Sequence, residues 1–159
     1  EGMHENVLLI RGFGKTYGCT GWRLGYAAGP SAIIDQMSKL QQYTFVCAPA
    51  PLQAGVVSCF DADMSEFVAE YESRRDMVVE RLSKHTTVGT PGGAFYVFAQ
   101  VPEHLGMTGT EFAEKCIERE LLVIPGGAFS ERDTHFRISF ATNRERLSKG
   151  LDILCDLMK

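Results

Sequence analysis

The chain has 159 residues, 45% of them hydrophobic and 23% charged, which supplies enough apolar material for a packed core and argues against intrinsic disorder. Its formal charge of −4 lacks the basic surplus of a nucleic-acid-binding surface, so no nucleic-acid partner is expected. No apolar run approaches the roughly 20 residues that cross a bilayer, and no signal peptide is visible, so no membrane association is expected.

The five cysteines are scattered and odd in number, and they include no Cys-x-x-Cys pair. This pattern argues against a disulfide framework and against a metal site. Most of the cysteines have apolar neighbours, as in Val46-Cys47-Ala48, so we expect buried and reduced thiols. Such thiols are typical of a cytoplasmic protein.

The first predicted element is a strand over residues 7–10, where a continuous apolar run indicates burial on both faces of a parallel sheet. A sheet rarely starts with its most buried strand, so we expect the chain to be a fragment of a longer protein. Residues 11–23 contain four glycines and are predicted to form a loop without regular structure. Residues 24–29 are predicted to form a short second strand.

Two helices are predicted next. Ser31 is expected to cap the first, and residues 52–60 form the second. The first helix has apolar residues at helical spacing, at Ile33, Ile34, Met37 and Leu40. The apolar stretch 44–60 is either part of the intrachain core or a contact surface for further chain or for a second copy.

The best internal boundary lies at residues 61–63, because Asp63 and Glu66 then have the spacing of a capping box ahead of a long helix. This helix is expected to run to about His85. Its apolar face is expected to consist of Phe67, Tyr71, Val78 and Leu82.

The remaining elements alternate between strands and helices. Strands are predicted over residues 94–98, 121–124 and 136–140, the last with strict period-two alternation. Capping boxes at Thr108/Glu111 and Thr142/Glu145 predict two helices. The final helix has an apolar stripe at Leu147, Leu151, Leu154 and Met158.

The order of elements indicates an α/β protein in two parts. Residues 1–60 have the pattern of the end of a larger parallel α/β domain, and residues 61–159 that of a compact α+β unit.

The glycine-rich loop carries the most suggestive side chains. Lys15 stands at the carboxyl end of a predicted strand, where open α/β sheets place ligands, and Arg23 follows at the start of the second strand. Exposed backbone amides and a guanidinium group are suited to binding a phosphate. A surface loop with two solvated cations is the alternative interpretation.

The segment from Gly14 to Tyr26, Gly-Lys-Thr-Tyr-Gly-Cys-Thr-Gly-Trp-Arg-Leu-Gly-Tyr, closely resembles the lysine motif of class I/II aminotransferases. These are fold-type I enzymes that use pyridoxal 5'-phosphate. The resemblance implies that Lys15 is the catalytic lysine that binds the cofactor covalently. It also implies that Arg23 holds the cofactor phosphate.

Three further motifs resemble the same family in the same order. They are Pro91-Gly92-Gly93-Ala94-Phe95-Tyr96, Pro125-Gly126-Gly127-Ala128-Phe129 and Phe136-Arg137-Ile138-Ser139-Phe140-Ala141. The last implies that Arg137 binds the α-carboxylate of the substrate. Independently, alternation places Arg137 on the strand face opposite Phe136 and Ile138, where a guanidinium requires an anionic partner or solvent.

The sequence departs from the family pattern at two positions before the lysine, where Gly12 and Gly14 replace serines that would bind the phosphate. The phosphate is then expected to bind either to the backbone N–H groups of these glycines or to Arg23 together with groups upstream. The family's acid for the pyridine nitrogen and its ring-stacking residue lie upstream of the lysine, and only fourteen residues precede Lys15. The resemblance therefore implies the carboxyl-terminal portion of an aminotransferase, cut in its large domain at residues 1–60 and with the small domain at residues 61–159.

The implied activity is amino-group transfer between an amino acid and a 2-oxo acid in the full-length protein, which the family implies to be a homodimer. The fragment alone is expected to be inactive. Two alternatives remain open. One is a related enzyme of the carbon–sulfur lyase or aminocyclopropane-carboxylate-synthase type, and the other is a ligand-sensing module of a transcriptional regulator.

Overall fold

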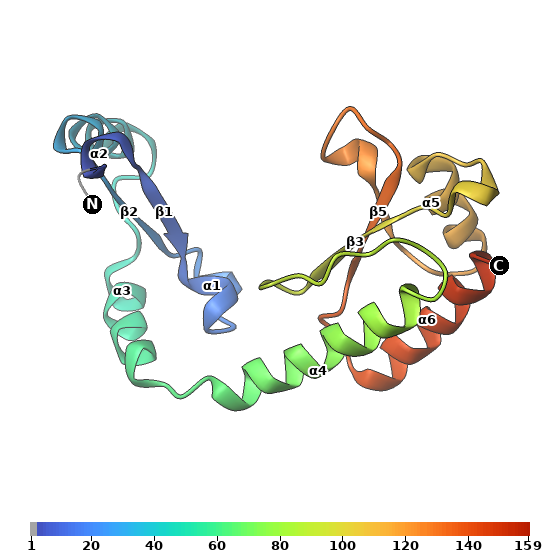
Figure 1. Ribbon diagram of the computed structural model, residues 1–159. Coiled ribbons are helices and arrows are strands. Elements are labelled where there is room, and N and C mark those ends of the chain that lie inside the picture. The colour runs from blue at the N-terminus through green and yellow to red at the C-terminus, as the bar shows by residue number, and fades with distance from the viewer. Residues whose placement is uncertain (1–2) are drawn as a thin grey trace. The chain divides into compact units, whose positions relative to one another are not determined.

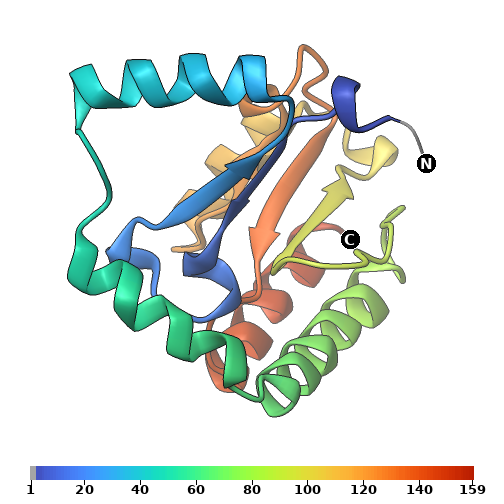
Figure 2. The same ribbon diagram turned by 90° about the vertical axis from the view of Figure 1, so that its left-hand side faces the viewer.

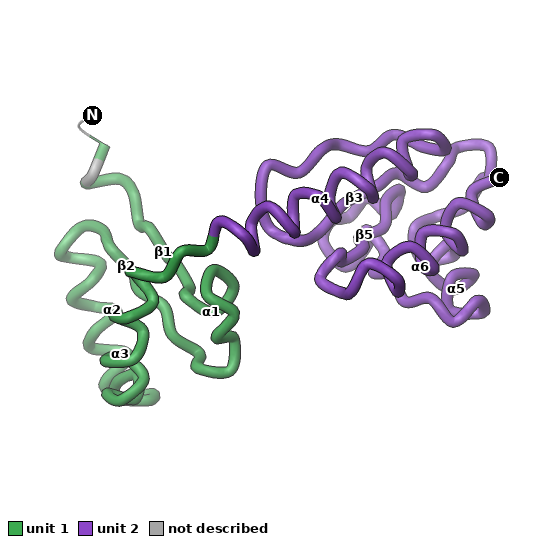
Figure 3. Tube along the Cα trace, turned by 90° about the horizontal axis from the view of Figure 1, so that it is seen from below, with its two compact units in different colours: residues 1–64 green, residues 65–159 purple. Residues whose placement is uncertain are grey.

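The computed structural model describes residues 3–159 and divides the chain into two compact units, Glu1–Met64 and Ser65–Lys159 (Figures 1 and 3). The order of strands and longer helices agrees with the prediction, with one helical turn, α1 (Phe13–Thr16), added inside the glycine-rich loop. Within the described residues, no helix is both long and apolar enough to cross a membrane.

The first unit contains a two-stranded antiparallel sheet, formed by β1 (Leu9–Gly12) and β2 (Gly25–Ala28). Leu9 pairs with Ala28 at one end, and Gly12 pairs with Gly25 at the other. The prediction of a parallel strand buried on both faces is therefore wrong for the described residues. The physical reason is the short connection, since a compact loop returns β2 beside β1, whereas parallel pairing needs a long crossover.

The apolar side chains of the first unit are largely exposed. Ile10 in β1 is 68% exposed, and Leu40 in α2 (Ser31–Thr44) is 67% exposed. The predicted stripe of α2 is thus not a buried stripe, and Ser31 is the first helical residue rather than the cap, which is Pro30. The second helix, α3, spans Ala50–Val57 and continues into a 3-10 turn over Ser58–Asp61.

The second unit is built on a three-stranded antiparallel sheet in the order β3-β5-β4. Its strands are β3 (Tyr96–Gln100), β4 (Ile124–Pro125) and β5 (His135–Ser139). The predicted alternation of β5 is confirmed, because Phe136 and Ile138 are buried while Arg137 between them is only half-buried. The predicted strand over residues 121–124 is reduced to a two-residue β4.

Three helices pack against the buried face of this sheet, namely α4 (Ser65–Leu82), α5 (Gly109–Glu118) and α6 (Arg144–Leu157). Helices α4 and α6 lie side by side (Figures 1 and 2). These three helices and the strands β3 and β5 contribute to one hydrophobic core, which includes Val78, Leu82, Val97, Ala99, Phe112, Cys116, Phe136, Ile138, Leu147, Leu151, Leu154 and Met158.

Fewer residues of α4, and fewer cysteines, are buried than the sequence predicts. Val78 and Leu82 are buried and Tyr71 packs against the core, but Phe67 at the start of α4 is 61% exposed. Helix α4 ends at Leu82, three residues before the predicted end.

Among the cysteines only Cys116 is buried, and burial raises the pKa of its thiol to about 11.

One of the two capping boxes is confirmed. The Thr108 side chain accepts a hydrogen bond from the Glu111 backbone N–H at 3.2 Å, and the Glu111 carboxylate accepts one from the Thr108 backbone N–H at 2.8 Å. The box predicted at Thr142 and Glu145 is wrong. The cap of α6 is Asn143, whose side-chain oxygen accepts a hydrogen bond from the Arg146 backbone N–H at 2.9 Å.

We expect Asn143→Ala to lower the free energy of unfolding of the second unit by about 1 kcal/mol, because the amide of Arg146 then loses its only side-chain acceptor at the helix start. Thr142→Ala is the matched control and should change it by less than about 0.5 kcal/mol. Urea unfolding followed by far-ultraviolet circular dichroism measures both. A larger loss in the Thr142 variant would contradict this assignment of the cap.

Candidate functional site

The glycine-rich loop is closed at its base by a backbone hydrogen bond. The Phe13 N–H donates to the Leu24 carbonyl at 3.1 Å, directly after the paired residues Gly12 and Gly25. Within the loop, α1 carries Lys15, and a 3-10 turn over Thr20–Trp22 precedes Arg23. The hairpin pairing therefore brings the lysine and the arginine to the same end of the sheet, although the sequence separates them by a loop.

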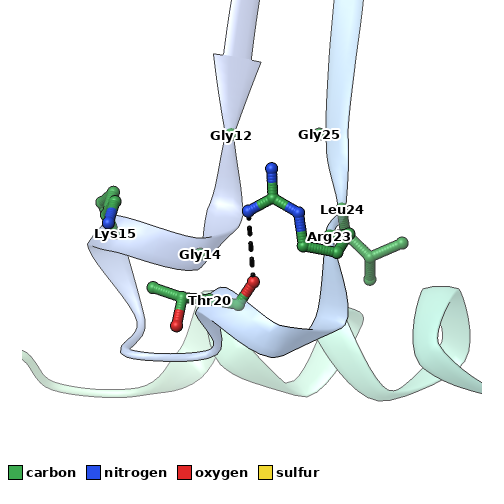
Figure 4. A pocket seen from close by; sticks show the side chains of 7 residues that line it. All are labelled: Gly12, Gly14, Lys15, Thr20, Arg23, Leu24 and Gly25. Atoms are coloured by element: carbon green, nitrogen blue, oxygen red, sulfur yellow. Dashed lines mark hydrogen bonds between the residues drawn. The ribbon is translucent and has the colours of Figure 1, made fainter.

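Four of the five predicted site residues line one hollow of about 260 Å³ at this end of the first unit. The Arg23 side chain lies between the ends of β1 and β2, and its Nη1 donates to the Thr20 carbonyl at 3.4 Å (Figure 4). Lys15 is exposed on the helical turn beside it. The complete lining is Gly12, Gly14, Lys15, Thr20, Arg23, Leu24 and Gly25.

Arg23 has a backbone conformation that places its side chain over the hollow. Its φ of 53° and ψ of 41° lie in the left-handed region, which costs a non-glycine residue about 1–2 kcal/mol. Such outliers cluster at ligand-binding sites, where the surrounding structure holds them in place. The preceding turn provides that support here, since the Arg23 N–H donates to the Thr20 carbonyl at 3.4 Å.

The glycines of the hollow differ in how much space surrounds them. A Cβ atom at Gly25 would lie 2.5 Å from the Arg11 carbonyl oxygen, and one at Gly14 would lie 3.0 Å from the Thr20 Cα atom. At Gly12 the nearest atom, the Leu24 carbonyl oxygen, is 3.8 Å away. The close approach of backbone segments therefore requires glycine at position 25 and favours it at position 14, but leaves position 12 open to a side chain.

The donors of this hollow are suited to an anion. Lys15 and Arg23 both line one small concavity whose remaining lining is mostly small residues and backbone. A guanidinium group can donate two parallel hydrogen bonds to a phosphate. Lys15 and Arg23 together suit a ligand that carries both a phosphate and a carbonyl group able to react with an amine.

The fifth predicted residue, Arg137, belongs to the second unit, on the sheet face opposite the core. Its guanidinium carbon lies 4.2 Å from the centre of the Tyr96 ring and 4.4 Å from that of the Phe129 ring. Neither aromatic residue is part of the predicted site. Pairing of β3 with β5 places Phe98 opposite Arg137, which puts Tyr96 two residues along β3 on the same face.

Asp133 holds the turn that carries Phe129. Its carboxylate accepts hydrogen bonds from the backbone N–H groups of Thr110 and Gly127, both at 2.9 Å. A hydrogen bond from the Thr110 side chain, followed by the bonds from the Gly127 and Thr110 backbone N–H groups, lowers the pKa of the Asp133 carboxyl group below its ordinary value. The turn is closed by a bond from the Phe129 N–H to the Gly126 carbonyl at 2.8 Å.

Comparison with known proteins identifies a single family. The family model described as "Aminotransferase class I and II" matches residues 1–154. A probable aspartate aminotransferase of Methanocaldococcus jannaschii is 36% identical over 98% of this chain and 44% of its own length. Aromatic-amino-acid aminotransferase 2 of Thermococcus litoralis is 34% identical over 100% of this chain and 43% of its own length.

A solved structure has the same fold. The aspartate aminotransferase of Thermotoga maritima superposes with a TM-score of 0.87 at 33% identity, over 96% of this chain and 40% of that one. The chain thus spans about two fifths of the length of the curated relatives it matches.

We expect Gly14→Ser to destabilise the first unit by about 1 kcal/mol, because its Cβ atom would press on the Thr20 backbone. Gly12→Ser is the matched control and should change the free energy of unfolding of the first unit by less than about 0.5 kcal/mol. Trp22, the only tryptophan, lies in this loop, so its fluorescence during urea unfolding measures both. Equal effects at the two positions would contradict the packing derived for this loop.

Proposed function

This chain belongs to the class I and II aminotransferase family, and on that premise we propose that the full-length protein transfers an amino group between an amino acid and a 2-oxo acid. We propose pyridoxal 5'-phosphate as its cofactor. The observation that carries the proposal is the hollow of the first unit, where the family's lysine and arginine, Lys15 and Arg23, line the same concavity.

The roles of the residues follow from their chemistry. When bound, the cofactor supplies a carbonyl carbon for attachment of an amine and an electron sink for the bond cleaved at the substrate Cα atom. Lys15 would hold the cofactor through its Nζ atom. The same amine would take the proton from the substrate Cα atom and return it during the exchange, so Lys15 is the acid and base of this site.

Two arginines orient the reactants in this proposal. Arg23 binds the phosphate of the cofactor together with the backbone N–H groups at Gly12 and Gly14. Arg137 binds the α-carboxylate of the amino acid, since a guanidinium group matches a carboxylate through two parallel hydrogen bonds. Both arginines act by binding and orientation, and only Lys15 moves a proton.

We further propose that residues 1–60 are the end of a cofactor-binding large domain and that residues 61–159 are a small carboxyl-terminal domain. A homodimer and a cytoplasmic location remain predictions from the sequence. The relatives are named for aspartate and for aromatic amino acids, so these two classes are the first substrates to assay.

In the full-length protein, Lys15→Ala should lower the rate of amino-group transfer by at least about a hundredfold, because the proton at the Cα atom loses its base. The visible absorbance of the lysine-bound cofactor should disappear as well. Lys39→Ala, a change of an exposed lysine on α2 outside the hollow, is the matched control and should leave both unchanged. Retained transfer in the Lys15 variant would refute the proposal. Release of ammonia or a thiol by the unaltered enzyme, with no 2-oxo acid added as amino acceptor, would indicate a lyase.

The 159-residue chain alone should bind pyridoxal 5'-phosphate only weakly and should transfer no amino group. It spans about two fifths of its relatives, and ordering its loop around a ligand costs about 1–2 kcal/mol for each residue fixed. Titration with the cofactor, followed by absorbance, tests the affinity, and exchange with a 2-oxo acid tests the turnover. Tight stoichiometric binding with measurable transfer would overturn this expectation.

A further inference from the structure

Arg137 has an unusual environment for a half-buried cation. Among the residues that the structure describes, it has no carboxylate within ion-pair distance, whereas Arg81 pairs with Asp152 and Arg144 pairs with Glu70. Its contacts are aromatic instead, with the Tyr96 ring at 4.2 Å and the Phe129 ring at 4.4 Å from the guanidinium carbon.

The two rings reach Arg137 from separate elements that are each held firmly. Tyr96 begins β3, and its pairing partner Ser139 is two residues from Arg137 along β5. Phe129 follows the 3-10 turn Gly126–Ala128, which the Asp133 carboxylate fixes through the Gly127 N–H. The aromatic contacts of Arg137 therefore result from strand register on one side and a hydrogen-bonded turn on the other.

Aromatic contacts leave the N–H groups of an arginine available, whereas an ion pair occupies them. A ring attracts the cation through its negative face but accepts no hydrogen bond in the plane of the guanidinium group. The N–H donors thus remain available, while the position of the group is restrained. A carboxylate binds to those donors in the same plane, by two parallel hydrogen bonds.

We propose that Tyr96 and Phe129 are positioning residues that hold the Arg137 guanidinium group ready for the α-carboxylate of the substrate. This inference rests on the proposed function, which assigns the carboxylate to Arg137. The two rings act through Arg137, by restraining a flexible side chain before the substrate arrives. The Arg137 side chain is then already partly ordered before the substrate binds, so less conformational entropy is lost in the binding step.

The test uses the full-length holoenzyme, with L-aspartate and L-phenylalanine as the amino-acid substrates. Phenylalanines with one, two and three ring fluorines are placed at position 129, because fluorination weakens the negative ring face with little change of shape. The KM for both amino acids should rise stepwise, by about two- to fivefold in total, with kcat unchanged within about twofold.

Substitutions at position 96 supply the second arm. Tyr96→Leu should raise KM by about two- to fivefold, while Tyr96→Phe retains the ring and should restore the original KM. Phe67→Leu is the matched control, since it makes a comparable change at a 61% exposed aromatic residue of α4 that is not one of the two rings recorded over the Arg137 guanidinium group. It should change neither KM nor kcat.

The outcomes separate this inference from the proposed function. If Arg137→Ala raises KM strongly while the fluorinated series and Tyr96→Leu leave it unchanged, the positioning role is wrong and the proposed function stands. If Arg137→Ala also leaves KM unchanged, Arg137 does not bind the carboxylate, and both its assigned role and the positioning role are overturned. Amino-group transfer itself is tested separately by Lys15→Ala. A stepwise rise of KM with fluorination supports the positioning role, because a purely space-filling ring would not respond to its charge distribution.

Discussion

The antiparallel pairing of β5 with β3 is the interaction on which the second unit depends. Phe136 and Ile138 are buried because three helices pack on their face of the sheet, and Arg137 between them must therefore lie on the opposite face. A slip of one residue in register would expose two large apolar side chains and turn the guanidinium group toward the core. The stability of the core and the placement of Arg137 thus have the same cause.

Features that depend on residues close together in the sequence could be predicted. Features that depend on contacts between distant parts of the chain could not. The alternation of β5 and the capping box at Thr108 depend on spacing within a few residues. The environment of β1 depends on what pairs with it and covers it, so the apolar run ending in Ile10 could not reveal an antiparallel hairpin. At the start of α6, Thr142 had the better capping spacing, yet the extended backbone that a cap requires occurs at Asn143.

The same distinction applies to the candidate site. Lys15 and Arg23 could be singled out because glycines and a strand end surround them within one short segment. Tyr96 and Phe129 were missed as contacts of Arg137, because the sequence separates the three and only the β3–β5 register and the turn held by Asp133 bring them together. The available signal was alternation, which places Tyr96 and Arg137 on outward faces of their strands once the pairing is known.

The two units differ in what can stabilise them. The second has a continuous core, whereas in the described part of the first unit only Leu24 and Val56 are buried hydrophobic residues. A two-stranded hairpin with so little burial is marginally stable by itself. Lys15 and Arg23 therefore lie on a loop whose order depends on further contacts, and a phosphate bound between them would supply some. Because a ligand that binds only the ordered loop also stabilises it, cofactor affinity and the order of the first unit must rise and fall together.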